Sequence, residues 1–190
     1  EKKYLKLKRG IKSGYLPDQL SIGPSSPYDP SKLELSTYNF IDSVLDQTDE
    51  YQSLRRLLKK ENPKIKGIKK GEKILKTDNF FQEIPNVISN LDNSYIYLQG
   101  PPGTGKTTQA ANAIVELIKK NKKVAITANS HKVIHNLIEK VEDTAVQKKI
   151  KFKGLKAGRE NDVDTVYNGK FVTTSSRDTD FIYGVKDKTT

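Results

Sequence analysis

Apolar residues recur at helical spacing along three stretches between residues 80 and 143. The stretch "FFQEIPNVISNL" (80–91) has them three or four positions apart, which predicts an amphipathic helix. The same spacing predicts helices over 108–120 and 131–143. The side chains expected to face inward are Phe81, Ile84, Val87, Ile88 and Leu91; Ala110, Ala111, Ile114, Leu117 and Ile118; and Val133, Ile134, Leu137, Ile138 and Val141.

Short apolar runs precede two of these helices and predict buried strands. They are "SYIYLQ" (94–99) and "KKVAITAN" (122–129). Strand, helix, strand, helix is the order of a βαβ unit, so we predict an α/β fold with a parallel sheet. Further on, "KIKFKGLKAG" is a candidate strand. The stretch "TVYNGKFVTT" is a candidate hairpin, because Asn168-Gly169 suits a type I′ turn.

The first part of the chain has a different pattern. Residues 10–31 are rich in Gly, Pro and Ser, which predicts an extended connector. Residues 32–60 are predicted to be helical, with leucines 54, 57 and 58 on one face, until "NPKIKG" stops the helix. We therefore divide the chain into 1–75, a connector and helical segment from a preceding domain, and 76–190, a second domain with an insertion or hairpin at 150–190.

Composition adds few constraints. The net charge of +11 suits phosphate backbones or anionic membranes, but 29 lysines against 5 arginines can also reflect genome composition. The absence of Cys excludes disulfides and is compatible with the cytoplasm, where we expect the protein. Neither a signal peptide nor an apolar run of membrane-spanning length is present, so we expect no membrane partner. The absence of Met leads us to expect a segment of a longer protein.

The glycine-rich stretch "GPPGTGKT" (100–107) carries the clearest chemistry. It matches G-x-x-x-x-G-K-[ST], in which glycines turn backbone N–H groups toward a phosphate chain at a helix N-terminus. Lys106 would reach the β- and γ-phosphates, and the Thr107 hydroxyl would ligate Mg²⁺. The residues predicted to bind a nucleoside triphosphate are Gly100, Pro101, Pro102, Gly103, Thr104, Gly105, Lys106, Thr107 and Thr108, with Lys106 and Thr107 in catalytic roles.

Three polar residues stand at the carboxyl edge of the second predicted strand. Asn129, Ser130 and His131 would stand at its carboxyl end, where open α/β sheets bind ligands. Short polar groups at a helix start can hold a nucleic-acid phosphate. Alternatively, Asn129 or Ser130 is an ordinary helix cap, and the two roles are compatible. His131 and His135 have the spacing of a zinc pair, but "HEXXH" is absent, so we interpret them as polar residues of a helix.

Together, "LQGPPGTGKTTQAANAIVELI" and "KKVAITANSHKVIHNLIEKV" resemble motifs I and Ia of superfamily 1 helicases, in the branch related to the nonsense-mediated-decay helicases. They are most similar to prokaryotic proteins that fuse a RecB-like nuclease to such a helicase. The resemblance is strong over 80–142, weak over 1–75 and poor after 150. It implies the N-terminal part of a RecA-like P-loop motor domain.

The resemblance also implies ligands and partners. The activity would be ATP hydrolysis with Mg²⁺, coupled to movement on single-stranded nucleic acid, with DNA favoured over RNA. Further partners would be the rest of the same polypeptide, namely a second motor domain and a nuclease domain. Motif Ia would place Thr127, Ala128, Asn129, Ser130 and His131 on the strand backbone. Gln82, which lies 18 residues before Gly100, matches a glutamine that reads adenine in the family.

Several family motifs are missing, which keeps two alternatives open. No apolar run ends in Asp-Glu, and no arginine finger is recognisable, so we expect the isolated segment to hydrolyse almost no ATP. An AAA-type ATPase also has "GPPGTGKT", but its acidic strand would fall near 161–171, where "NDVDTVYNGKF" is unsuitable. The other alternative is a module that binds nucleotide or nucleic acid without turnover.

Overall fold

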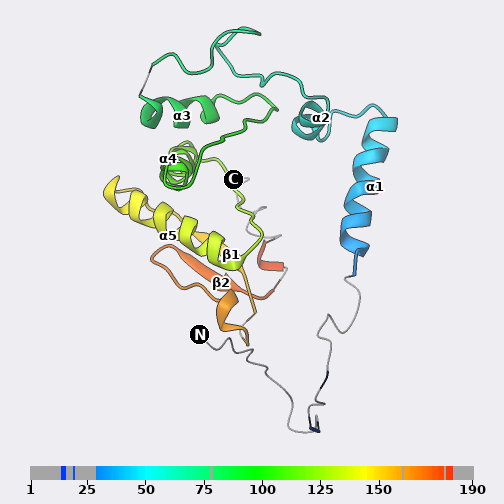
Figure 1. The fold of residues 1–190 in the computed structure, drawn as a ribbon, viewed down its shortest axis with the longest axis vertical. Coiled ribbons are helices and arrows are strands. Elements are labelled where there is room, and N and C mark those ends of the chain that lie inside the picture. The colour runs from blue at the N-terminus through cyan, green and yellow to red at the C-terminus, as the bar shows by residue number, and fades with distance from the viewer. Residues whose placement is uncertain are drawn as a thin grey trace, which may run out of the picture. The chain divides into compact units, whose positions relative to one another are not determined.

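The computed structural model describes residues 14–15, 19, 29–77, 79–159, 161–177 and 179–181. The chain separates into two compact units, Glu1–Glu50 and Tyr51–Thr190. The first contains helix α1 (Ser31–Leu45). The second contains α2 (Gln52–Leu58), α3 (Phe80–Ser89), α4 (Lys106–Lys119), α5 (His131–Gln147), β1 (Gly154–Ala157), the 3₁₀ turn η1 (Val163–Thr165) and β2 (Val172–Ser175) (Figure 1). The predicted domain division after residue 75 stays a prediction.

The helical stretch predicted over 32–60 is interrupted. Helix α1 ends at Leu45 and α2 begins at Gln52. Between them, Gln47 and Tyr51 have left-handed backbones, with φ of 54° and 53°. This conformation cannot continue a right-handed helix. Helix α2 ends at Leu58, before the predicted Asn-Pro stop.

All three helices predicted from apolar spacing are confirmed, and they pack in sequence order. Helix α4 contacts α3 on one side and α5 on the other, as Figure 1 shows. The core consists of Ala111 and Val115 from α4 with Val141 and Ala145 from α5, and Phe152 and Phe171 pack against it. Because α4 is covered from two sides, its buried set is wider than a single predicted face: Gln109, Ala111, Ala113 and Val115.

The only sheet among the described residues joins β1 and β2 in parallel, with Gly154 opposite Val172 and Ala157 opposite Ser175. The candidate strand in "KIKFKGLKAG" is therefore confirmed, whereas the hairpin prediction is wrong. Gly169 N–H does bond Val172 O at 2.9 Å, so the chain turns there. Residues 166–171 form no strand, and β2 bonds to β1 instead.

The two strands predicted next to the glycine-rich loop are not formed in the structure. Residues 94–99 and 122–129 have no strand assignment. A strand requires ladder hydrogen bonds to a neighbour, and within the described part of the chain neither segment has a partner strand. The chain is nevertheless an α/β protein with a partial P-loop fold. No described helix combines the length and apolarity needed to cross a membrane.

A buried carboxylate of α5 binds the segment 167–172, called the C-terminal segment below. Glu142 is 3% exposed. One carboxylate oxygen accepts from the backbone N–H groups of Phe171 (2.6 Å) and Val172 (2.9 Å), and the other accepts from the Tyr167 hydroxyl (2.8 Å). Burial alone would raise the pKa of Glu142, but these hydrogen bonds outweigh it and hold the pKa below its ordinary value.

Candidate functional site: the phosphate loop and the strand-edge pocket

The glycine-rich loop is a tight turn that requires its glycines. Gly103 and Gly105 have φ of 82° and 78°, a backbone that residues with a Cβ rarely adopt. A Cβ on Gly100 would stand 2.8 Å from the Thr104 hydroxyl oxygen. That hydroxyl donates to Pro101 O at 2.8 Å and closes the turn.

One positively charged side chain and uncapped backbone N–H groups lie where the loop meets α4. The Lys106 ammonium donates to Gly100 O at 2.5 Å and Pro101 O at 2.6 Å, so it lies across the loop. Helix α4 begins at Lys106 without a side-chain cap, which leaves its first N–H groups available to an anion. Lys106 and Thr107 are both exposed. This donor set fits a polyphosphate and, through Thr107, its metal ion.

The first turn of α3 lies next to this loop. A ring carbon of Phe81 is 3.8 Å from the place that a Cβ on Gly105 would occupy. Phe81 was predicted to face inward, but it is 58% exposed. Its neighbour Gln82 is also exposed. The fold thus places Gln82 in the turn that borders the loop, and its contact with adenine stays a prediction.

The three residues predicted to contact nucleic acid stand at the start of α5. Ser130 is the helix N-cap, and its hydroxyl oxygen accepts from Val133 N–H at 3.3 Å. The capping interpretation is therefore observed for Ser130. Asn129 and His131 are exposed. Contact of these residues with a nucleic-acid strand stays a prediction.

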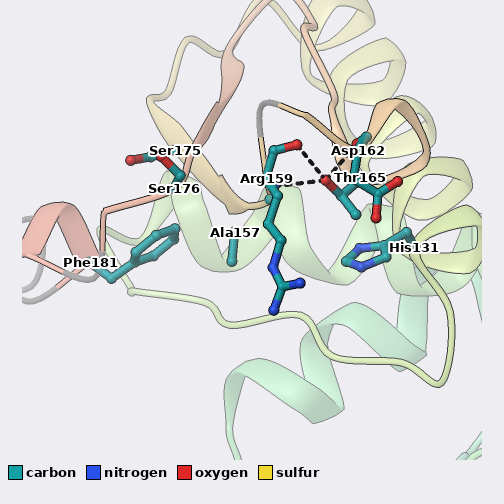
Figure 2. A pocket seen from close by; sticks show the side chains of 9 residues that line it. His131, Ala157, Arg159, Asp162, Thr165, Ser175, Ser176 and Phe181 are labelled. Carbon is teal, nitrogen blue, oxygen red and sulfur yellow. Dashed lines mark hydrogen bonds between the residues drawn. The ribbon is translucent and has the colours of Figure 1, made fainter. Parts of the chain in front are cut away.

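His131 also lines a pocket of about 380 Å³ at the carboxyl ends of β1 and β2 (Figure 2). Ala157 and Ser175 are the last residues of the two strands, and both border it. The other lining residues are Gly158, Arg159, Asp162, Thr165, Ser176 and Phe181. Figure 2 shows the side chain of Arg159 between the labelled residues Ala157 and His131.

The sequence interpretation missed Arg159, Ser175 and Ser176. Arg159 lies two residues beyond β1, and its backbone N–H bonds the Thr165 hydroxyl at 2.7 Å. A signal was available, because polar residues after a strand indicate a ligand edge. The hairpin prediction paired β2 with an antiparallel strand, so the sequence did not predict that the carboxyl ends of β1 and β2 lie at the same edge.

Beneath the pocket lies Lys156, which is 4% exposed. Its ammonium contacts Ala157 O at 2.9 Å, Thr165 O, and the Nδ1 atom of His131 at 3.2 Å. Burial lowers the pKa of Lys156, and the nearby Asp162 partly offsets this effect. The pKa of His135, one turn after His131, is lowered by burial and then by Lys156 and His131.

Comparison with known proteins agrees with this arrangement. Residues 82–180, just over half of the chain, match the AAA domain family in the type found in superfamily 1 helicases. The chain belongs to this AAA domain family. The predicted resemblance to superfamily 1 helicases is thereby confirmed. The family is of the helicase type, so the match favours a helicase over the alternative of an AAA-type ATPase.

Individual relatives match a smaller part of this chain than the family does. DNA-binding protein SMUBP-2 is 30% identical in Mesocricetus auratus and 32% in Mus musculus, each over 48% of this chain and 10% of the relative. The RecBCD enzyme subunit RecD of Buchnera aphidicola is 43% identical over 30% of this chain and 10% of the relative. The chain thus spans about a tenth of the length of these relatives. No solved structure matches it.

Proposed function

We propose that this chain is the nucleotide-binding part of an ATP-dependent helicase or translocase that acts on single-stranded nucleic acid, with DNA favoured over RNA. The observation that carries the proposal is the loop at 100–107. It combines two left-handed glycines, an uncapped helix start and a lysine lying across the turn. The family match supports an ATP-dependent motor, and the DNA-binding and RecBCD relatives support nucleic acid as its ligand.

Nucleotide binding follows from the loop chemistry. The N–H groups at the start of α4 and the Lys106 ammonium would hold the phosphates, and the Thr107 hydroxyl would ligate Mg²⁺. Bound Mg²⁺ would neutralise charge between the phosphates. Lys106 has to exchange its two backbone carbonyl partners for phosphate oxygens. Charge-assisted bonds to phosphate are shorter and stronger than bonds to carbonyls, which favours the exchange.

The first test measures affinity for a fluorescent ATP analogue with and without Mg²⁺. Lys106→Ala is expected to weaken binding by at least about 2 kcal/mol, or about thirtyfold, because a charged contact is lost. Lys119→Ala is the matched control, since Lys119 is exposed at the other end of α4. Equal affinity of the Lys106→Ala and Lys119→Ala proteins would reject the loop as the nucleotide site.

We assign binding of the single-stranded nucleic acid to the start of α5 and the adjoining pocket. Asn129, His131 and Arg159 offer exposed donors there, and phosphate contacts of this kind carry no base preference. Affinity should fall with salt as counterions are released. The general lysine surface would give the same trend, so the deciding comparison is between variants of the full-length motor.

His131→Ala is expected to reduce nucleic-acid-stimulated ATPase while leaving nucleotide affinity nearly intact. Ser130→Asn tests the neighbouring hydroxyl. The substitution removes the hydroxyl but keeps α5 capped, because Asn is a good helix cap. The control replaces the lysines at the end of α4 and in the segment that follows it, namely Lys119, Lys120, Lys122 and Lys123. If the lysine variant loses stimulation and His131→Ala does not, the basic surface is the binding site.

Binding without turnover is the second candidate. It is favoured for the isolated chain by one observation: no apolar run in the sequence ends in Asp-Glu. Phosphate release by the isolated chain should therefore be far below the usual enzyme range of about 1 s⁻¹ and above. A rate in that range would reject this candidate and show that the chain holds its own catalytic carboxylate.

A further inference from the structure

Lys156 occupies an unusual place for a charged residue. Along β1 its neighbour Leu155 is 36% exposed, whereas Lys156 is 4% exposed. The ion pairs found within the described part of the chain do not include Lys156. A buried charge without a carboxylate partner is costly unless its hydrogen bonds are satisfied. Its three hydrogen-bond partners therefore explain its position.

When Lys156 is charged, its partners fix the direction of each hydrogen bond. An ammonium group has three N–H donors and no acceptor. Two of the donors go to the carbonyls of Ala157 and Thr165. The third meets Nδ1 of His131 at 3.2 Å. Nδ1 must then accept this bond, and the ring proton of a neutral His131 must sit on Nε2.

We propose that Lys156 is a positioning residue that holds His131 in its Nε2–H tautomer, so that the ring donates to a phosphodiester oxygen of a bound single strand. The proposal rests on the nucleic-acid part of the proposed function. Ser130 uses its hydroxyl oxygen as the cap of α5. His131 is exposed, borders the pocket and has its ring held by Lys156, so it supplies an oriented side-chain donor at this helix start.

The same contact has an opposite interpretation, which makes the proposal testable. Burial favours the neutral form of Lys156, and a neutral amine could accept a proton from Nδ1–H. His131 would then carry its proton on Nδ1 and present a bare Nε2, which a phosphate oxygen cannot use. Asp162 opposes part of this effect of burial and favours the charged amine, on which the proposed tautomer depends.

The tautomer is read by NMR of the full-length protein labelled with ¹⁵N in histidine, with His131 assigned by comparison with His131→Gln. We expect a protonated Nε2 and a bare Nδ1. Lys156→Met, which keeps the length of the side chain but has no donors, should give a mixture of tautomers. Lys156→Arg should restore the single tautomer. A protonated Nδ1 in the wild type would overturn the proposal.

The functional test measures binding of a fluorescent single-stranded oligothymidylate at fixed salt. Lys156→Met should bind about tenfold more weakly, the cost of one lost oriented contact. The matched control is Lys153→Met, which removes the same charge from an exposed position three residues earlier. The double variant Lys156→Met/His131→Ala should bind no more weakly than His131→Ala, because both changes remove one contact.

The outcomes separate this proposal from the one it rests on. If His131→Ala weakens binding and Lys156→Met does not, the positioning role is refuted and the nucleic-acid site stands. Additive losses in the double variant would show that Lys156 acts on the strand directly, which also refutes positioning. If neither single variant weakens binding, the nucleic-acid site itself is misplaced. Thermal unfolding of each variant identifies any loss of folded protein.

Discussion

Glu142 offers the sharpest test of what holds the C-terminal segment in place. Replacing it with Ala removes the acceptor from the Phe171 and Val172 N–H groups and from the Tyr167 hydroxyl. A stranded buried N–H costs roughly 1–3 kcal/mol. Val172 is 5% exposed, whereas Phe171 is half-buried, so the cost of leaving the Phe171 N–H without an acceptor is smaller. We expect Glu142→Ala to lower the free energy of unfolding by about 3–4 kcal/mol.

Glu142→Gln separates the charge from the hydrogen bonds. The amide oxygen can still accept from the two N–H groups, and the amide nitrogen can donate to the Tyr167 hydroxyl, which then accepts. Neutral bonds are weaker than charged ones, so we expect a loss of about 1–2 kcal/mol. The pKa of Glu142 is lowered in the folded protein from its ordinary value of 4.5. Its charge therefore stabilises fully above that value. The difference between wild type and Gln should disappear as the pH falls below 4.5 through the lowered pKa.

The assay is urea denaturation followed by far-UV circular dichroism, at neutral pH and at acidic pH. Glu139→Ala is the control, because Glu139 lies on the same helix with its side chain exposed. It should change the free energy of unfolding by less than about 0.5 kcal/mol. If Glu142→Ala and Glu139→Ala unfold at the same urea concentration, the carboxylate does not hold the segment and this reasoning is wrong.

Three further substitutions test particular contacts. A Cβ on Gly169 would overlap the Glu142 carboxylate, so Gly169→Ala should destabilise by about 2 kcal/mol in urea, and by less in a Glu142→Ala background. Gly100→Ala would crowd the Thr104 hydroxyl, so an ATP-analogue titration should show weaker binding with the thermal midpoint nearly unchanged. Lys148→Ala breaks a partly exposed ion pair to a glutamate of α4, so urea denaturation should show a loss of at most about 1 kcal/mol.

The sequence by itself determined the features that depend on local spacing. Helices α3, α4 and α5 follow from apolar residues three or four apart, because one face of a helix must be covered whatever covers it. The loop at 100–107 is equally local. Its glycines, lysine and threonine act on one ligand from adjacent positions, so the motif carries its geometry with it.

Strand pairing was decided only by the tertiary structure. Residues 94–99 and 122–129 have the composition of strands but no ladder among the described residues, whereas the less apolar 154–157 and 172–175 do pair. Strand propensity alone predicts strands poorly, because the backbone hydrogen bonds of a strand are made to a neighbouring strand and not within the segment itself. The Asn168-Gly169 signal likewise predicted a local hairpin where β2 bonds to β1 in parallel.

The polar contacts beside the strand ends also required the fold. Lys156 and His131 are 25 residues apart, and each alone is ordinary for the surface of a basic protein. Only the tertiary fold buries the lysine and brings the start of α5 within reach of its third donor. Periodicity and motifs describe what neighbours in sequence do together, so a pair formed across such a distance leaves no local signal.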